Sequence, residues 1–195
     1  MEFADLGRAA VELKSMAATT SRLMTVAEFS NLPDDDGPFY HELRNGEVVA
    51  VPRPKIKHQI IQERVRESLK SIAPPGSYVA TEVPYRALRE HELRVADVAY
   101  VSAERWSQCD QDDYLHGAPD LVFEVLSPSN TAIEMYEKER LCLENGAKEF
   151  WVIDPDRRQV KVSTPDGTTR TWKLGQEIPL PLFGENTLAV DAVFA

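Results

Sequence analysis

The stretch that decides the fold is PDLVFEVLSPSN, residues 119–130, which is typical of a short buried strand that runs into a polar loop. Its apolar residues are of the types that strands favour: Leu121, Val122, Phe123, Val125 and Leu126. Glu124 lies in the middle of this run. An ionised carboxylate is costly there unless a cation or several hydrogen-bond donors bind it. Glu124 therefore indicates a specific role for its carboxylate.

The residues after this strand predict a helix and then a second strand. NTAIEMYEKERLCLENG, residues 130–146, has a glycine suited to end a helix, and KEFWVIDP, residues 148–155, returns as a strand. Lys138 lies on the inward stripe of the helix, in register with Met135 and Cys142. Because helical side chains lean toward the N-terminus, Lys138 reaches back toward the strand of Glu124. The alternative is a lysine whose stem covers apolar surface while its charge stays in water.

The rest of the chain predicts further strands and one long amphipathic helix. The expected elements are a capping box at 25–28, a hairpin in YHELRNGEVVAV (40–51), a helix in HQIIQERVRESLKSIA (58–73), strands at about 78–88 and 93–101, a hairpin at 159–172 and a last β segment near Val190. Helices and strands alternate in part of the chain and strands follow one another elsewhere. We therefore expect a mixed α/β fold, with helices flanking a mixed central sheet and additional β-hairpins.

Composition and charge restrict the classes of function. The chain has 195 residues, 43% of them hydrophobic, and a net charge of −10. It has no apolar run of the ~20 residues that span a membrane. The two cysteines show no metal-binding spacing, so we expect a reduced, cytoplasmic setting. The negative charge argues against a strong constitutive DNA binder but suits a carboxylate site for a divalent cation. We expect residues 1–23 to form an extension and residues 24–195 one domain.

Three further acids lie in predicted strands. Asp120 opens its strand, where aspartate commonly caps a turn, so we favour a structural role for it. Glu42 lies on a hairpin arm, and taken alone it is typical of a solvated surface residue. Asp97 lies within VADVAYV, residues 95–101, a run that is apolar on both alternating faces, as is the strand of Glu124. That pattern predicts two carboxylates converging on a metal ion, with a lysine nearby to stabilise negative charge on a phosphodiester.

Five segments occur here in the order in which one family has them: YHELRNGEVV, HQIIQERV, VADVAYV, PDLVFEVLSPSN and EKERLCLENGAKEFWVIDP. The chain closely resembles the Uma-two family of restriction endonucleases, within the PD-(D/E)XK nuclease superfamily. The resemblance runs from about Met24 to about Pro155, and more loosely to the C-terminus. It implies a restriction-endonuclease-like core and a metal-dependent site.

The resemblance also implies the site residues. The first acid is Asp97 and the second is Glu124, while Leu126 stands where the superfamily has its lysine. In the family the lysine has moved to the next helix, eight residues before the glycine, which is Lys138 here. Glu42 matches an early family glutamate. The metal contacts implied are those of Asp97, Glu124 and Val125, and Ala96 departs from the proline that often precedes the first acid.

We expect a Mg²⁺-dependent endonuclease that hydrolyses DNA, with Mn²⁺ as a substitute for Mg²⁺. One alternative is a catalytically inactive interaction module that keeps the nuclease fold. A carboxylate-pair hydrolase such as a glycosidase is the weakest alternative, because a lysine lies in the site and no aromatic sugar platform is visible. A chain this small has little room for a separate recognition domain, so cutting two strands favours a homodimer, formed through the sheet edge or the C-terminal hairpins.

We further expect Asp97, Glu124 and Lys138 to converge with Glu42 on their rim. Asp120 is separated from Glu124 by four residues of one strand, or ~13 Å, too far for both to bind one Mg²⁺ easily. Asp97 can lie across from Glu124 on a neighbouring strand. His58 opens the long helix and could approach a phosphate, although a histidine there more often has a structural or solvated role. Basic residues are scattered, with a mild cluster at 53–57.

Overall fold

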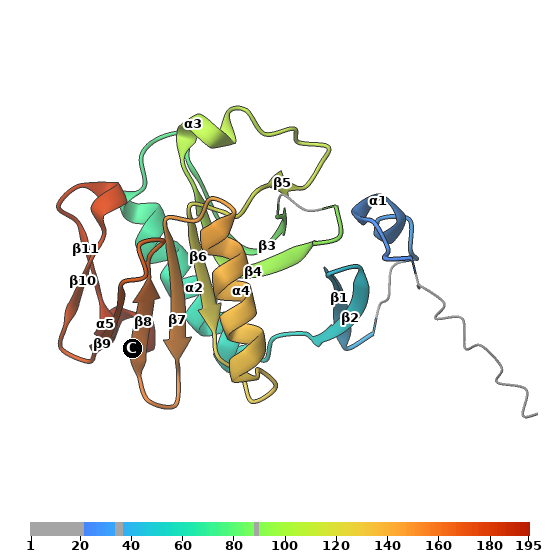
Figure 1. The fold of residues 1–195 in the computed structure, drawn as a ribbon. Coiled ribbons are helices and arrows are strands. Elements are labelled where there is room, and N and C mark those ends of the chain that lie inside the picture. The colour runs from blue at the N-terminus through green and yellow to red at the C-terminus, as the bar shows by residue number, and fades with distance from the viewer. Residues whose placement is uncertain (1–21, 34–36, 88–89) are drawn as a thin grey trace, which may run out of the picture.

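The computed structural model describes residues 22–33, 37–87 and 90–195, so the expected extension over residues 1–23 falls almost entirely outside the described part. A seven-stranded mixed sheet forms the centre, in the order β5-β3-β4-β6-β7-β8-β9 (Figure 1). Its strands are β3 (Tyr78–Arg86), β4 (Arg94–Val101), β5 (Leu115–His116), β6 (Leu121–Val125), β7 (Glu149–Asp154), β8 (Gln159–Ser163) and β9 (Thr169–Lys173).

Two short hairpins and five helices make up the rest of the secondary structure in the described residues. The hairpins pair β1 (Phe39–Arg44) with β2 (Glu47–Pro52), and β10 (Glu177–Pro179) with β11 (Thr187–Ala189). The helices are α1 (Val26–Phe29), α2 (Ile56–Ile72), α3 (Ala103–Trp106), α4 (Ala132–Glu144) and α5 (Val190–Phe194), with a 3₁₀ turn at Pro181–Phe183. The mixed sheet flanked by helices confirms the expected fold class.

The strand PDLVFEVL becomes β6, whose five residues are all buried and which lies between β4 and β7 at the centre of the sheet. It runs antiparallel to β4 and parallel to β7, and α4 makes the connection from β6 to β7. A capping box at Thr131 and Glu134 starts α4, because each side chain binds the other residue's backbone N–H. This β6-α4-β7 unit fixes the helix that carries Lys138 against the strand that carries Glu124.

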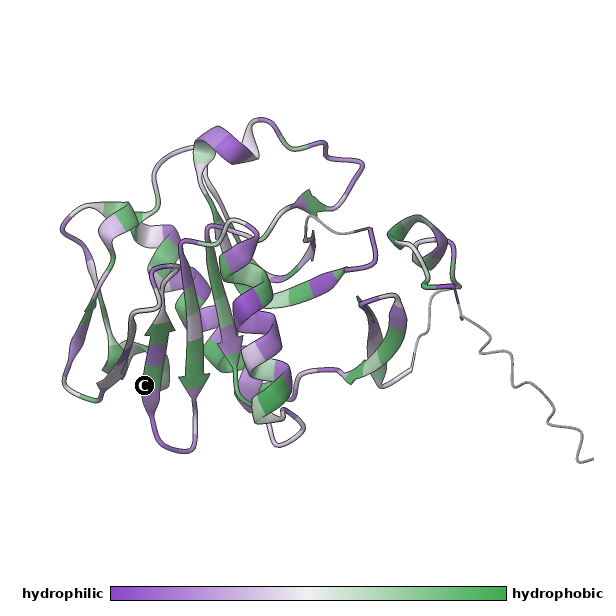
Figure 2. Cartoon of the chain, viewed as in Figure 1, coloured by the Kyte–Doolittle hydropathy of each residue, from purple (hydrophilic) through white to green (hydrophobic). Residues whose placement is uncertain are grey.

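The two long helices cover opposite faces of the sheet, with α4 in front and α2 behind in Figure 1. On the α2 side, Ile61, Val65 and Leu69 pack against β6 and β7, including the fully buried Trp151. On the α4 side, Cys142 packs in a second cluster with residues of β3, β4 and β7. Figure 2 shows that, unlike these central strands, α3 and the loop after it are largely hydrophilic. The sheet is thus covered on both faces, as the doubly apolar strands predict.

The β1–β2 hairpin turns at Asn45 and Gly46, as the sequence predicts. Their φ angles of 48° and 78° lie in the left-handed region, which the tight hairpin turn requires and which Asn-Gly favours. The hairpin stands apart from the main sheet and joins it through one bridge between Leu43 and Leu93. The expected capping box at Thr25 and Glu28 forms α1 beside it.

The ladder between β3 and β4 is interrupted at Asp97. Thr81 pairs with Val98 and Val83 with Ala96, so Glu82 and Asp97 are left unpaired between them. Regular alternation would place Ala96 on the α2 side with Val98, yet Ala96 packs on the α4 side with Ala99. Glu82, with a φ of 51°, absorbs the distortion on the other strand. A local bulge therefore places Asp97, an arrangement that the apolar pattern alone did not predict.

The C-terminal part differs from the expectation. The last β segment, β11, ends at Ala189, and Val190 begins the short helix α5, whose Val190 and Val193 are buried in the α2-side core. Five residues are too few to show helical periodicity, which explains why the sequence did not predict this helix. Within the described residues, no helix is long and apolar enough to cross a membrane.

Candidate active site

A buried ion pair between Lys138 and Glu124 lies at the centre of the site. Lys138 Nζ donates to Glu124 Oε2 at 2.7 Å and to the backbone carbonyl of Val95 at 2.7 Å. The two side chains come from α4 and β6 and are 11% and 8% exposed. The other carboxylate oxygen of Glu124, Oε1, is buried and has no hydrogen-bond partner. Lys138 is therefore not a surface lysine with its charge in water.

Asp97 lies across from Glu124 on the neighbouring strand. Val98 pairs with Phe123, and one more residue along this antiparallel register brings Asp97 opposite Glu124. The carboxylate of Asp97 accepts hydrogen bonds from Val125 N at 2.7 Å and from Gln62 Nε2 at 3.1 Å. Val125, expected to contact the metal, thus contacts Asp97 through its backbone N–H.

Glu42 is not on the rim of the site but behind it, with a relative exposure of 1%. Its Oε1 accepts from Val95 N at 2.9 Å and lies 3.8 Å from Lys138 Nζ, while its Oε2 accepts from Arg44 Nε at 2.9 Å. Arg94 adds a second guanidinium, 3.7 Å away. The expectation of a rim position was wrong because this face of the hairpin packs against β4. Glu42 holds the backbone of Val95, whose carbonyl in turn holds Lys138.

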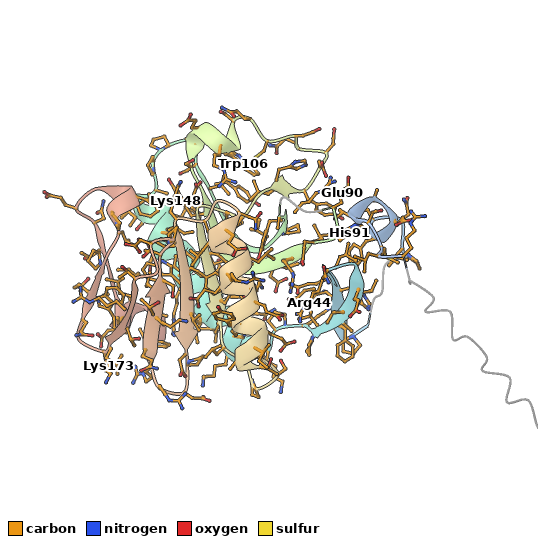
Figure 3. All side chains as sticks on the ribbon, viewed as in Figure 1. Arg44, Glu90, His91, Trp106, Lys148 and Lys173 are labelled. Atoms are coloured by element: carbon orange, nitrogen blue, oxygen red, sulfur yellow. The ribbon has the colours of Figure 1, made fainter. Side chains whose placement is uncertain are left out.

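Arg44 ties the hairpin to α4 (labelled in Figure 3). Its guanidinium binds Glu42 on its own strand and donates to Glu134 Oε1 of the α4 capping box at 2.8 Å. One arginine thus links the early glutamate to the first turn of the helix that carries Lys138. No local sequence pattern indicates this contact, since Arg44 and Glu134 are 90 positions apart.

Two residues of α2 hold Asp97 from the other side. Gln62 is 2% exposed and donates to Asp97, a role that the sequence reasoning missed. His58 Nε2 lies 3.0 Å from Asp97 Oδ2, although the two atoms are not aligned for a hydrogen bond. His58 and Gln62 are four residues apart and share one helix face, and the same face continues to the buried Val65 and Leu69. The four-residue spacing of His58 and Gln62 was the sequence signal that could have placed Gln62 at the site.

Asp120 has the structural role that its position predicts. Its Oδ2 accepts from Ser102 N at 2.8 Å, just before α3, and its Oδ1 accepts from Arg105 at 3.1 Å. Both oxygens therefore bind the segment that begins α3. Asp120 stands at the opposite end of β6 from the Lys138–Glu124 pair.

The electrostatics of the site are those of crowded acids around one buried ammonium. Burial raises the pKa of Glu124 above its ordinary value, and Asp97 and Glu42 add to the effect while Lys138 opposes it. Burial also opposes ionisation of Glu42, yet Lys138, Arg44 and Arg94 together hold its pKa below the usual range. Burial disfavours the charge on Lys138, but Glu124 and Glu42 outweigh it and raise the lysine's pKa. A divalent cation beside Glu124 would favour its ionised form.

The donor set fits Mg²⁺ better than a metal that needs several protein ligands. The unpartnered Oε1 of Glu124 is a buried oxygen that can accept a cation, and Asp97 offers a second carboxylate on the neighbouring strand. Within the described residues, no three His, Cys, Asp or Glu side chains are arranged to hold a metal ion together. Mg²⁺ is commonly bound by one or two carboxylates and keeps several waters.

Two surface hollows lie away from these three groups. One, of about 430 Å³, lies between α4 and the strands β7 to β9, and another, of about 460 Å³, lies beside the first turns of α2. Neither is lined by Asp97, Glu124 or Lys138. A buried contact joins Lys138 to Glu124, and Asp97 is tied to the same strand through its hydrogen bond with Val125 N. The position of the candidate site rests on these contacts and their chemistry.

The comparison with protein families matches residues 26–191 to the model of the family Uma2, described as "Putative restriction endonuclease". The chain belongs to the Uma2 family. This confirms the resemblance inferred from the ordered segments. No curated protein matches this Uma2 chain.

A solved structure supports the same conclusion for the fold of this Uma2 protein. It is the crystal structure of a protein from Anabaena variabilis described as "a putative nuclease belonging to DUF820". The two chains are 25% identical, with a TM-score of 0.74 over 88% of this chain and 97% of that chain. The alignment thus includes almost all of the solved chain, and the fold is that of a nuclease-like protein.

Proposed function

We propose that this Uma2 protein is a Mg²⁺-dependent endonuclease that hydrolyses phosphodiester bonds of DNA. The observation that carries the proposal is the 2.7 Å contact of Lys138 with Glu124, beside an acid from the neighbouring strand. Two carboxylates and a lysine from three separate elements are the groups that metal-assisted phosphodiester hydrolysis needs. Membership of a family described as "Putative restriction endonuclease" supports DNA as the substrate.

The residues have separate tasks in this proposal. Asp97 and the free Oε1 of Glu124 would hold the cation, which when bound supplies a Lewis acid and a water of lowered pKa. Lys138 fixes Glu124 through Oε2, and its ammonium can stabilise negative charge that develops on the phosphate. Glu42 keeps Lys138 charged and holds the Val95 backbone that Lys138 also binds. Gln62 orients Asp97.

A second candidate is an interaction module that keeps the fold without catalysis. The observation that favours it is the low side-chain exposure of Glu124 and Lys138, 8% and 11%, with neither of the two surface hollows at the site. A buried ion pair can be retained for packing alone. Such a module needs no divalent cation, so metal binding separates the two candidates.

Cleavage of a supercoiled plasmid tests the proposal. We expect nicked or linear products with Mg²⁺ or Mn²⁺ and none with excess EDTA, because both acids act only through a bound cation. Calorimetric titration of the protein with Mn²⁺ is expected to show binding. Absence of both cleavage and Mn²⁺ binding would leave the interaction module as the better description.

We also propose that the protein is a homodimer, joined through the sheet edge or the C-terminal hairpins. The strand β9 ends the described sheet, and β10 and β11 form a separate hairpin near it. Such an edge offers backbone groups to a second copy. Light scattering at micromolar concentration is expected to give twice the chain mass of 22.0 kDa. A monomer mass under these conditions contradicts the proposal.

A further inference from the structure

The hollow beside the first turns of α2 is lined by cations in a chain that is otherwise acidic. Lys57, Arg64 and Arg158 line it, together with apolar side chains, and no acidic residue does. The whole chain has 32 acidic against 22 basic residues, so a lining of this kind departs from the average surface. The volume of the hollow, about 460 Å³, leaves room for part of a ligand and not only for water. We call it the α2 groove.

The cations of the α2 groove are only weakly neutralised by the protein. The side chain of Arg64 has no ion-pair or hydrogen-bond partner among the described residues, although its backbone carbonyl accepts from Ser68 Oγ at 2.8 Å. Lys57 lies 3.7 Å from Asp156, but both side chains are highly exposed, 71% and 88%, so the pair is weak. Among the residues that the structure describes, the Arg158 side chain reaches only the backbone carbonyl of Phe194, at 3.5 Å. Positive charge is therefore available to an external anion.

The α2 groove adjoins the candidate site through the first turn of α2. Lys57 is followed directly by His58, whose ring lies 3.0 Å from Asp97. From Lys57 to Arg64 the helix rises about 10 Å, at 1.5 Å per residue. One DNA strand places a phosphate every ~3.4 Å along the helix axis, so this length matches about three phosphates. The exposed Ile56 and Ile60, 75% and 44% exposed, border the cations with apolar surface.

We propose that the α2 groove binds the phosphodiester backbone of duplex DNA beside the position that is cut. The inference rests on the proposed function, since it takes DNA as the substrate. It explains how a chain with a net charge of −10 can hold a polyanion. Three cations gathered at one place supply the local attraction that the whole molecule lacks.

Salt-dependent binding of a fluorescein-labelled duplex, measured by anisotropy in EDTA, tests the α2 groove without any cleavage. The groove variant is Arg64→Gln with Arg158→Gln, and the control is Lys70→Gln with Lys148→Gln, which removes the same charge. Lys70 lies in the last turn of α2, and Lys148, labelled in Figure 3, precedes β7, whereas Arg158 follows β7. Lys57→Gln with Arg158→Gln repeats the test at exposed positions if the half-buried Arg64 proves necessary for folding.

The slope of log affinity against log salt is negative. We expect it to become less steep by about 1.8 in the groove variant, or 0.9 for each lost phosphate contact. Its affinity at low salt falls at least about tenfold, while the control keeps the slope of the parent protein. Equal loss in both variants, or a parent that binds no duplex, overturns the inference. Because binding is measured without metal, a parent that binds duplex but never cleaves it overturns the proposed function alone.

Discussion

Asp97→Asn is expected to abolish Mg²⁺-dependent cleavage and to weaken Mn²⁺ binding at least about tenfold, because it removes one of the two carboxylates that we propose to hold the metal. The fold is expected to survive, since the amide fits the same space and still accepts one of the two hydrogen bonds that Asp97 receives from Gln62 and Val125. We expect plasmid nicking to fall at least about 100-fold. Calorimetric titration with Mn²⁺ measures the metal contact separately from cleavage.

Asp120→Asn is the matched control, because it makes the same chemical change at the other acid of the same region. Asp120 binds Ser102 N and Arg105, far from Lys138, so its loss is expected to cost about 1–3 kcal/mol of stability and to leave metal binding intact. Urea unfolding of both variants measures the stability difference. Normal Mn²⁺ binding by Asp97→Asn together with its loss in Asp120→Asn would show that the first metal ligand has been assigned to the wrong aspartate.

The sequence predicted the main elements of the site because their signals are local. An apolar strand that contains one acid, and a lysine on the inward stripe of the next helix, are both visible within about 20 residues of chain. The Asn-Gly turn and the capping box at Thr25 and Glu28 are equally local, and each forms as expected. The contact between Lys138 and Glu124 needs only the β6-α4-β7 connection to bring both groups together.

The features that were missed depend on contacts between distant segments. Glu42 is buried because its hairpin packs against β4, and its hairpin pattern alone is that of a surface strand. Gln62 reads as a surface residue until Asp97 is placed beside it. The bulge that points Asp97 toward α2 involves an unpaired residue on each of two strands, and alternation within one strand cannot reveal the partner.

The interruption of the β3–β4 ladder and the two helices α2 and α4 together position Asp97 and Glu124. The interruption at Glu82 and Asp97 lets Asp97 reach Gln62 on α2, while Glu124 faces Lys138 on α4. Each acid is thus held by a different helix, and the two meet across one strand pair. A change in either helix moves one acid relative to the other, so the separation of the two acids depends on how both helices pack on the sheet.

Lys138→Met is expected to destabilise the protein by about 3–5 kcal/mol, because it leaves the buried Glu124 and Glu42 without their shared cation. The methionine fills a similar volume, so the loss reflects charge and hydrogen bonding more than a cavity. Urea unfolding at neutral pH measures the change. Lys161→Met is the matched control, since Lys161 also pairs with an acid of α4, Glu139, but is 38% exposed and is expected to cost no more than about 1 kcal/mol.

The double variant Lys138→Met with Glu124→Gln separates packing from catalysis. Without the buried carboxylate, much of the stability lost in Lys138→Met is expected to return, so the two single changes are strongly non-additive. Plasmid cleavage is expected to stay absent in the double variant, because the restored fold still lacks both the ammonium and the carboxylate that we propose to hold the metal. Cleavage that returns with stability would make Lys138 and Glu124 a packing pair only. Equal stability of Lys138→Met and Lys161→Met would show that the ion pair is not buried in solution.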